Sequence, residues 1–411
     1  MRRGVNIAVQ CERDLIRELA HRVAEIAASP EQAAIQRRWR DVNALRKPDR
    51  APVWCRPVEA WHELLPDDAL TCEDRFHRGL ERALRHILIK HEIGDDEPVE
   101  RTWRVAASFT QTPAHTWGVE IRRIEPDEPG GAYHYDSPLK EEADFDRLAL
   151  PTYTYDPERT RRALERTDET LGDILPVVPG CDAPLSGTLC DTAAALRGQG
   201  ELMWDLAERP HLVHRLMAHL SEGTVRAQRA REATGLLTLN NHGPMYTSDP
   251  PDPAPPPGQV RLSDLWIAAN SQDFDQVSPA MWEEFLLAYQ RPIFEQFRFV
   301  SYGCCENLTR KMDTVLSIPN LRVFVCSAWT DLEKVVEAVG DRYVIMWRQK
   351  ATDVIFATDL HEIRRQVDEG MRIAAGCRVQ IVLRELQTLN GHLDRLKEWA
   401  TVAKEVAWRY A

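Results

Sequence analysis

The segment of residues 298–348 decides the fold of this chain: RFVSYGCCENLTRKMDTVLSIPNLRVFVCSAWTDLEKVVEAVGDRYVIMWR. It contains three short runs rich in β-branched and aromatic residues, at 298–303, 321–326 and 343–348. An amphipathic stretch at 329–339 separates the second run from the third. Strands that alternate with helical stretches indicate parallel pairing, because parallel neighbours need a long crossover connection.

The same alternation extends through most of the chain. Further strand candidates lie at 52–56, 104–109, 173–178, 235–240, 264–269 and 379–386. Helix candidates lie at 156–170, 199–233, 279–296, 359–375 and 392–410. This order predicts an α/β fold, and specifically a (β/α)8 TIM barrel that occupies residues 49–411 as one unit.

Three regions depart from the alternation. Residues 12–48 place charged and apolar positions at helical spacing, so we assign residues 1–48 to an N-terminal helical extension that covers the barrel bottom or a neighbouring subunit. The segment 110–155 contains Pro and Gly turns and is predicted to be an excursion or lid over the barrel mouth. The proline run DPPDPAPPP at 249–257 predicts a stiff active-site loop.

Composition narrows the class of protein. The 411 residues are 43% apolar and 28% charged, as in ordinary globular proteins. A net charge of -12 argues against nucleic acid as a partner. No apolar run approaches the roughly 20 residues that cross a bilayer, so we expect no membrane partner and a cytoplasmic location. The nine scattered cysteines do not indicate a disulfide framework. The composition is compatible with a homodimer.

Polar residues follow many of the predicted strands. Because the strand ends of a barrel meet at one mouth, these side chains are expected to line a single site for a small-molecule substrate. The set that we single out is Arg56, His242, Asp273, Cys304, Cys305, Arg348 and Glu385.

The cysteine pair indicates a metal site. Thiolates, imidazole and carboxylate are ligand types that zinc accepts, so Cys304, Cys305 and Glu385 are the first metal candidates, with His242 as a further ligand. Neighbouring strand residues point to opposite faces, but the glycine at position 303 permits a turn that brings both thiols to one ion. The alternative is that one thiol is buried and the other lines the pocket.

The remaining candidates are suited to proton transfer and anion binding. Asp273 or His242 is a candidate to move a proton. Arg56 and Arg348 are candidates to hold carboxylates of a substrate.

Several motifs resemble those of the uroporphyrinogen decarboxylase superfamily. DRAPVWCRP at 49–57 resembles its opening motif. SQDFDQVSPAMWEEFLLAYQRPIFEQF, SYGCCENLTRKMDTVLSIPNL and DLEKVVEAVGDRYVIMWR follow in the order and spacing of that superfamily. The resemblance covers roughly residues 50 to 405 and implies a (β/α)8 barrel that acts either as a porphyrinogen decarboxylase or as a zinc-dependent methyltransferase.

The resemblance is better to the methyltransferase branch. There the family has His-x-Cys-Gly, and this chain has Tyr302, Gly303, Cys304 and Cys305, so Cys304 matches the zinc cysteine while Glu385 stands near the distal cysteine position. The decarboxylase branch has an arginine-rich loop after the first strand and an aspartate after the second. Only Arg56 of that pattern is kept here.

We therefore predict a zinc-dependent methyltransferase that acts with a corrinoid protein or a thiol acceptor. A corrinoid would be carried by that partner protein. The alternatives are a decarboxylase of the uroporphyrinogen decarboxylase type, and a barrel that binds a metabolite or a corrinoid protein without catalysis.

Overall fold

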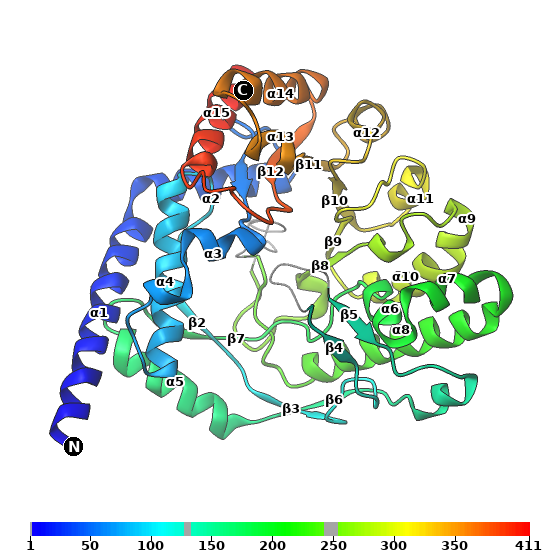
Figure 1. Ribbon diagram of the computed structural model, residues 1–411, viewed down its shortest axis with the longest axis horizontal. Coiled ribbons are helices and arrows are strands. Elements are labelled where there is room, and N and C mark those ends of the chain that lie inside the picture. Colours follow the sequence, from blue (N-terminus) through cyan, green and yellow to red (C-terminus); the bar gives the residue numbers. More distant parts are fainter. Residues whose placement is uncertain (1, 127–132, 242–253) are drawn as a thin grey trace.

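A parallel sheet of six strands dominates the computed structural model, which describes residues 2–126, 133–241 and 254–411 (Figure 1). The strand order is β1-β12-β11-β10-β9-β8, and every pair is parallel. The strands are β1 (Val53–Cys55), β8 (Trp266–Ala269), β9 (Phe299–Tyr302), β10 (Leu321–Cys326), β11 (Val344–Gln349) and β12 (Arg378–Leu383). A second parallel pair joins β2 (Trp103–Ala106) to β7 (Val177–Gly180).

The main sheet is strongly curved. Strands β9 and β12 are separated by β10 and β11, so a flat sheet would hold them about 14 Å apart. The residues that follow these two strands nevertheless touch, because Cys305 Sγ lies 3.4 Å from Glu385 Oε1. The predicted parallel α/β architecture is thus confirmed. A closed eight-stranded barrel is not established, since the two parallel sheets are separate within the described residues.

One predicted strand is absent from the described structure. Residues 235–240 form no strand, although they lie between β7 and β8. The Thr238 amide donates to the Cys181 carbonyl, and the Cys181 amide donates to Thr238 Oγ1, both at 2.8 Å. The Asn240 side chain bonds both backbone groups of Trp266. Side chains therefore replace part of the backbone ladder here.

Most helices alternate with the strands and lie on the outer side of the curve, whereas the short helix at Trp61–Leu64 lies nearer the centre (Figure 1). The longer ones are α4 (Arg75–Ile93), α5 (Pro157–Leu171), α7 (Gln199–Glu208), α8 (Pro210–Glu232), α14 (Leu360–Ile373) and α15 (Arg395–Arg409). Shorter ones are α3 (Trp61–Leu64), α6 (Cys190–Arg197), α9 (Pro279–Trp282), α10 (Ala288–Phe294), α11 (Met312–Leu316), α12 (Leu332–Val339) and α13 (Ala351–Ile355). The helix predicted over 199–233 is two helices, because Pro210 cannot continue α7 and instead begins α8.

The N-terminal segment consists of α1 (Arg2–Ala28) and α2 (Pro30–Asn43). Trp39 of α2 is fully buried and packs with side chains from the inner face of the sheet, among them Val323 and Met346. Gln380, near the start of β12, donates to Asn43 Oδ1 at 2.7 Å. Helix α2 therefore covers the N-terminal ends of the strands, opposite the edge where the polar candidates gather.

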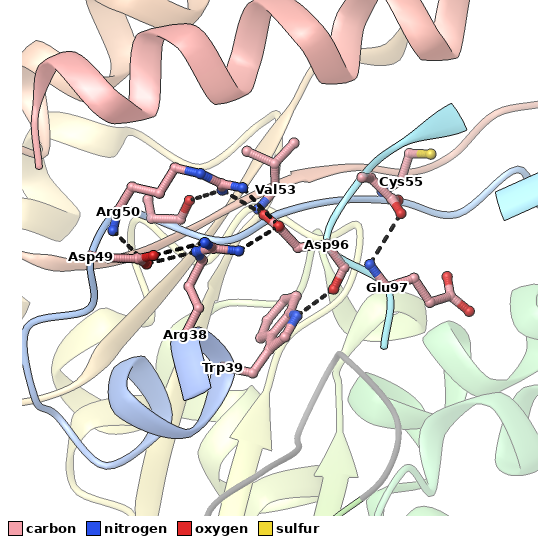
Figure 2. A network of polar contacts seen from close by, with 10 residues as sticks. Arg38, Trp39, Asp49, Arg50, Val53, Cys55, Asp96 and Glu97 are labelled. Carbon is pink, nitrogen blue, oxygen red and sulfur yellow. Dashed lines mark hydrogen bonds and ion pairs between the residues drawn. The ribbon is translucent and has the colours of Figure 1, made fainter. Parts of the chain in front are cut away.

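A buried ion network joins α2 to the first strand (Figure 2). The Asp96 carboxylate accepts from Arg38 Nη1 at 2.7 Å and from two nitrogens of Arg50 at 2.6 and 2.8 Å. The Val53 amide at the start of β1 also donates to it, at 2.8 Å. Arg38 also donates to both carboxylate oxygens of Asp49, at 2.7 and 2.8 Å. Because two carboxylates thus face two guanidinium groups and all are hydrogen-bonded, burying them is tolerated.

Two further regions complete the chain. The described residues of 109–126 and 133–155 include two antiparallel pairs outside the parallel sheets, β3 (Phe109–Thr112) with β6 (Thr152–Tyr155) and β4 (Arg122–Ile124) with β5 (His134–Asp136). Most of the predicted proline loop at 249–257 falls outside the described residues. No helix in the described part of the chain combines the length and apolarity that crossing a bilayer requires.

Candidate functional site

The C-terminal edge of the main sheet gathers four of the predicted site residues. Cys304 and Cys305 follow β9, Arg348 is the second-last residue of β11, and Glu385 follows β12. Their side-chain atoms are in contact, as described below. The convergence that the strand order predicted is therefore observed for these residues.

A tight turn after β9 presents both cysteines to the site. Gly303 has φ +114°, and a Cβ placed on it would lie 3.0 Å from the Val325 carbonyl oxygen, so the position requires glycine. Glu306 then anchors the turn, because its buried carboxylate accepts from the Cys304 amide at 2.9 Å and the Ser271 amide at 2.7 Å. Burial raises the pKa of Glu306.

The two thiols lie side by side. The distance from Cys304 Sγ to Cys305 Sγ is 3.5 Å. Two guanidinium groups approach Cys304 Sγ, Arg348 Nη1 at 3.6 Å and Arg384 Nη1 at 3.9 Å. Both cysteines are partly exposed. The Cys304 sulfur is thus reachable and has positive charge beside it.

These contacts separate the acidities of the two thiols. The hydrogen bond from Cys305 lowers the pKa of Cys304 to about 5 against the effect of burial, with help from the charges of Arg348 and Arg384. The same hydrogen bond, together with burial and the Glu385 carboxylate, raises the pKa of Cys305. These contacts therefore favour a thiolate on Cys304 beside a thiol on Cys305.

Arg348 holds the centre of the cluster. Its side chain is 1% exposed, and Nη1 donates to Glu385 Oε1 at 2.7 Å and to the Cys304 carbonyl at 2.9 Å. Its Nε and Nη2 atoms are buried and have no hydrogen-bond partner among the described residues. Burial, with the charges of Arg348 and Arg56, lowers the pKa of Arg384. Three arginines thus make the mouth electropositive.

The cluster does not fit zinc as it stands. The Glu385 oxygen next to the Cys305 sulfur is already bonded to Arg348, whose fixed positive charge also faces Cys304. A dication would meet that charge directly. The described part of the chain contains no grouping of three or more His, Cys, Asp or Glu side chains arranged to hold a metal ion.

The other predicted site residues have different surroundings. Asp273 lies near Cys190 and Asp191, whose pKa values are raised by burial and by its charge. Arg56 is exposed and its amide donates to the Leu383 carbonyl at 2.9 Å. His242 lies outside the described residues. Tyr302 points away from the mouth, because its hydroxyl donates to Gln290 at 2.9 Å in the core.

Sequence reasoning gave no role to two residues that shape the site, Glu306 and Arg384. Both adjoin predicted candidates, since Glu306 follows the cysteine pair and Arg384 precedes Glu385. The available signal was a charged residue directly beside a strand end. That signal does not reveal that the Glu306 side chain folds back to cap the turn, or that the Arg384 side chain approaches the Cys304 sulfur.

Comparisons with known proteins give a fold but no family. No family model matches the chain, and no curated protein matches its sequence. Among solved structures it is similar to a methyltransferase from Methanosarcina mazei, with a TM-score of 0.52 and 14% identity. The match covers 90% of this chain and 98% of that one. At this identity the likeness shows a shared fold alone.

Proposed function

We propose that this chain is a methyltransferase related to the uroporphyrinogen decarboxylase superfamily, with Cys304 as its nucleophile. The observation that carries the proposal is the position of the Cys304 sulfur between Arg348 and Arg384 at the C-terminal edge of the sheet. Parallel α/β folds place their active sites at that edge. The fold shared with a methyltransferase supports the class of reaction.

In the proposed step the Cys304 thiolate attacks the methyl carbon of a donor. A sulfur–carbon bond forms, the bond from carbon to the leaving atom breaks, and its electron pair stays on that atom. The two arginines favour the thiolate over the thiol, which keeps the nucleophile available at neutral pH. In the next step the bond from the Cys304 sulfur to the methyl carbon breaks and the thiolate leaves; a methyl thioether is a poor methyl donor, so this step needs a strong nucleophile. Reduced cobalt in a corrinoid protein is such a nucleophile, and we propose that partner.

The substrate is proposed to be a small molecule with an anionic group. Arg384 lies 3.9 Å from the Cys304 sulfur and is partly exposed, and Arg56 is exposed and close enough to lower the pKa of Arg384. A carboxylate or a similar anion would pair with these two guanidinium groups. The roles of Asp273 and His242 in proton transfer remain predictions. The activity of Asp273→Asn would test that role for Asp273.

Zinc binding remains a prediction from the sequence. The metal content of the purified protein tests it. We derive no step through zinc, because Arg348 already neutralises the carboxylate that would bind the ion. Stoichiometric zinc in the purified protein, lost in Cys304→Ser, would replace the thiolate proposal with a metal-based one.

A single-turnover experiment tests the proposal. The full chain is incubated with methylcobalamin under reducing conditions, which runs the methyl exchange between Cys304 and cobalt in reverse. The mass of the peptide of residues 299–310 is then measured after cleavage at Arg298 and Arg310. We expect the mass of one added CH2 on Cys304 together with reduced cobalamin. Cys304→Ser should show neither product, whereas Cys11→Ser, a change at an exposed cysteine far along the chain, should behave as wild type. Equal cobalamin demethylation by Cys304→Ser and wild type would refute the role of Cys304.

Decarboxylation is the second candidate function, because the three arginines also suit a substrate with several carboxylates. Strand β2 ends at Ala106, and the next residues contain no aspartate of the kind that the decarboxylase resemblance requires. Turnover of uroporphyrinogen by the purified protein would favour this candidate over methyl transfer.

A further inference from the structure

The two adjacent thiols at the mouth are arranged to react with each other. Neighbouring residues in a strand point to opposite faces. After Gly303, with its φ of +114°, the chain leaves β9 and both sulfurs lie on one side, 3.5 Å apart. A disulfide needs a sulfur separation near 2.05 Å, so closure requires an approach of about 1.5 Å.

The surroundings suit oxidation of this pair. Both cysteines are partly exposed, whereas Cys55, Cys72, Cys181, Cys190 and Cys326 are buried. Arg348 and Arg384 lie beside the Cys304 sulfur, at 3.6 and 3.9 Å, and stabilise negative charge on it, while the Cys305 sulfur lies within hydrogen-bonding distance. An accessible thiolate with a resolving thiol beside it is the arrangement of redox-sensitive cysteines.

We propose that Cys304 and Cys305 are a modification site, at which a hydroperoxide converts the two thiols into a reversible disulfide between adjacent residues. This goes beyond the proposed function and does not depend on it, because the bond can form whatever group the site transfers.

The chemistry balances in two steps. The Cys304 thiolate attacks the outer oxygen of the hydroperoxide, the oxygen–oxygen bond breaks, and the sulfur becomes a sulfenic acid. The other oxygen leaves with the electron pair as hydroxide or alkoxide and takes a proton from solvent to give water or an alcohol. The Cys305 sulfur then attacks that sulfenic sulfur and displaces hydroxide, which takes the Cys305 proton and leaves as water. Two thiols are oxidised and one hydroperoxide is reduced.

Closure would switch off any reaction that uses the Cys304 thiolate. The disulfide sulfur carries no negative charge and no longer faces Arg348 and Arg384 as an anion. The ion pair between Arg348 and Glu385 involves neither sulfur, so it stays in place when the disulfide forms. Reduction by a dithiol would restore the site.

The peptide of residues 299–310 makes the test direct, because Cys304 and Cys305 are its two cysteines. The full chain is treated with hydrogen peroxide, blocked with iodoacetamide and cleaved without reduction. We expect the peptide to be two hydrogens lighter than the dithiol form and to carry no alkyl group. Prior treatment with dithiothreitol should restore two alkyl groups.

Matched variants separate this outcome from general oxidation. Cys305→Ser should stop at a Cys304 sulfenic acid that dimedone captures, whereas Cys11→Ser and Cys377→Ser should close the disulfide as wild type does. The inference is wrong if the wild-type peptide keeps two alkylatable thiols after peroxide, or if Cys304 proceeds to sulfinic acid equally with and without Cys305. Failure of methyl transfer from methylcobalamin leaves this result unaffected.

Discussion

At the scale of single residues, the acidity of Cys304 gives the sharpest prediction. Its pKa is about 5, against an ordinary thiol value of 9.0, so the thiolate should predominate above pH 6 and disappear below pH 4. The rate of alkylation by iodoacetamide at the 299–310 peptide should therefore be half-maximal near pH 5 and fall about tenfold per unit below it.

Variants identify what stabilises this thiolate. Arg384→Met and Cys305→Ala should each move the midpoint of alkylation to higher pH, because each removes a group that lowers the Cys304 pKa. Arg291→Met is the control, since Arg291 bonds Ser317 among the outer helices. A wild-type midpoint above pH 8, or one that Arg384→Met leaves in place, would contradict the electrostatic account.

The predictable part of the site is the part that strand order determines. Cys304, Arg348 and Glu385 each adjoin the end of a strand, and parallel strands bring such positions together. Side-chain direction is not determined in that way. Asp273 follows a strand end equally but lies toward Cys190 and Asp191, because the residues after β8 turn into a short 3-10 helix that points its carboxylate there.

At the scale of elements, the turn after β9 depends on one glycine. Gly303→Ala should lower stability by about 1–3 kcal/mol, because alanine resists a positive φ and its Cβ would meet the backbone of Val325. It should also slow alkylation of Cys304 by displacing the sulfur from the arginines. Urea unfolding and the 299–310 peptide assay measure the two effects.

Gly340 provides the matched control for this turn. It also has a positive φ, of +56°, but a Cβ there meets nothing within 4 Å. Gly340→Ala should cost some stability through strain and leave the reactivity of Cys304 unchanged. Equal reactivity of Cys304 in Gly303→Ala and in wild type would show that the turn does not position the thiol.

The order of elements was predictable because apolar runs and amphipathic stretches follow the backbone period directly. Residues 235–240 show where that reasoning stops. Their apolar run resembles a strand, but Thr238 and Asn240 satisfy neighbouring backbone groups with side-chain atoms instead of a continuous ladder. An apolar pattern specifies burial, and it does not specify which atoms make the hydrogen bonds.

The buried ion network between α2 and β1 gives a second prediction at this scale. Asp96→Ala should destabilise the fold by about 3–5 kcal/mol, because it leaves the buried guanidinium groups of Arg38 and Arg50 without their shared carboxylate (Figure 2). Glu405→Gln breaks the exposed ion pair with Arg364 and should have a much smaller effect. Urea midpoints of the two variants measure the difference, and equal losses would mean that burial does not set the cost.

At the scale of the whole molecule, charge is distributed unevenly. The chain carries a net charge of -12, yet its mouth presents Arg56, Arg348 and Arg384. A negative surface with a positive mouth lets an anionic substrate bind locally while the overall field opposes large polyanions. The net charge does not reveal this positive mouth, because the mouth forms only where the C-terminal ends of β1, β11 and β12 lie next to one another.

Carboxylates in several parts of the molecule link its stability to acid pH. Backbone amides of Thr71 and Cys72 and the Arg85 side chain donate to Glu81. Against the effect of burial, these bonds lower the pKa of Glu81 from 4.5 to about 2. Similar bonds lower the pKa values of Glu12 and Glu63. A carboxylate with a depressed folded-state pKa stabilises the fold above its unfolded pKa, and this contribution is lost as pH falls through the folded value.

The melting temperature should therefore fall by several degrees as pH decreases from about 5 to about 2. Glu81→Gln should melt below wild type at neutral pH, because a neutral amide makes weaker bonds to the same donors, and the gap should close toward pH 2 as wild-type Glu81 becomes protonated. Glu25→Gln, at an exposed position of α1, should follow the wild-type curve throughout. Calorimetry across this pH range measures the melting temperatures. A difference in melting temperature between Glu81→Gln and wild type that stays constant down to pH 2 would show that Glu81 does not contribute to the acid response.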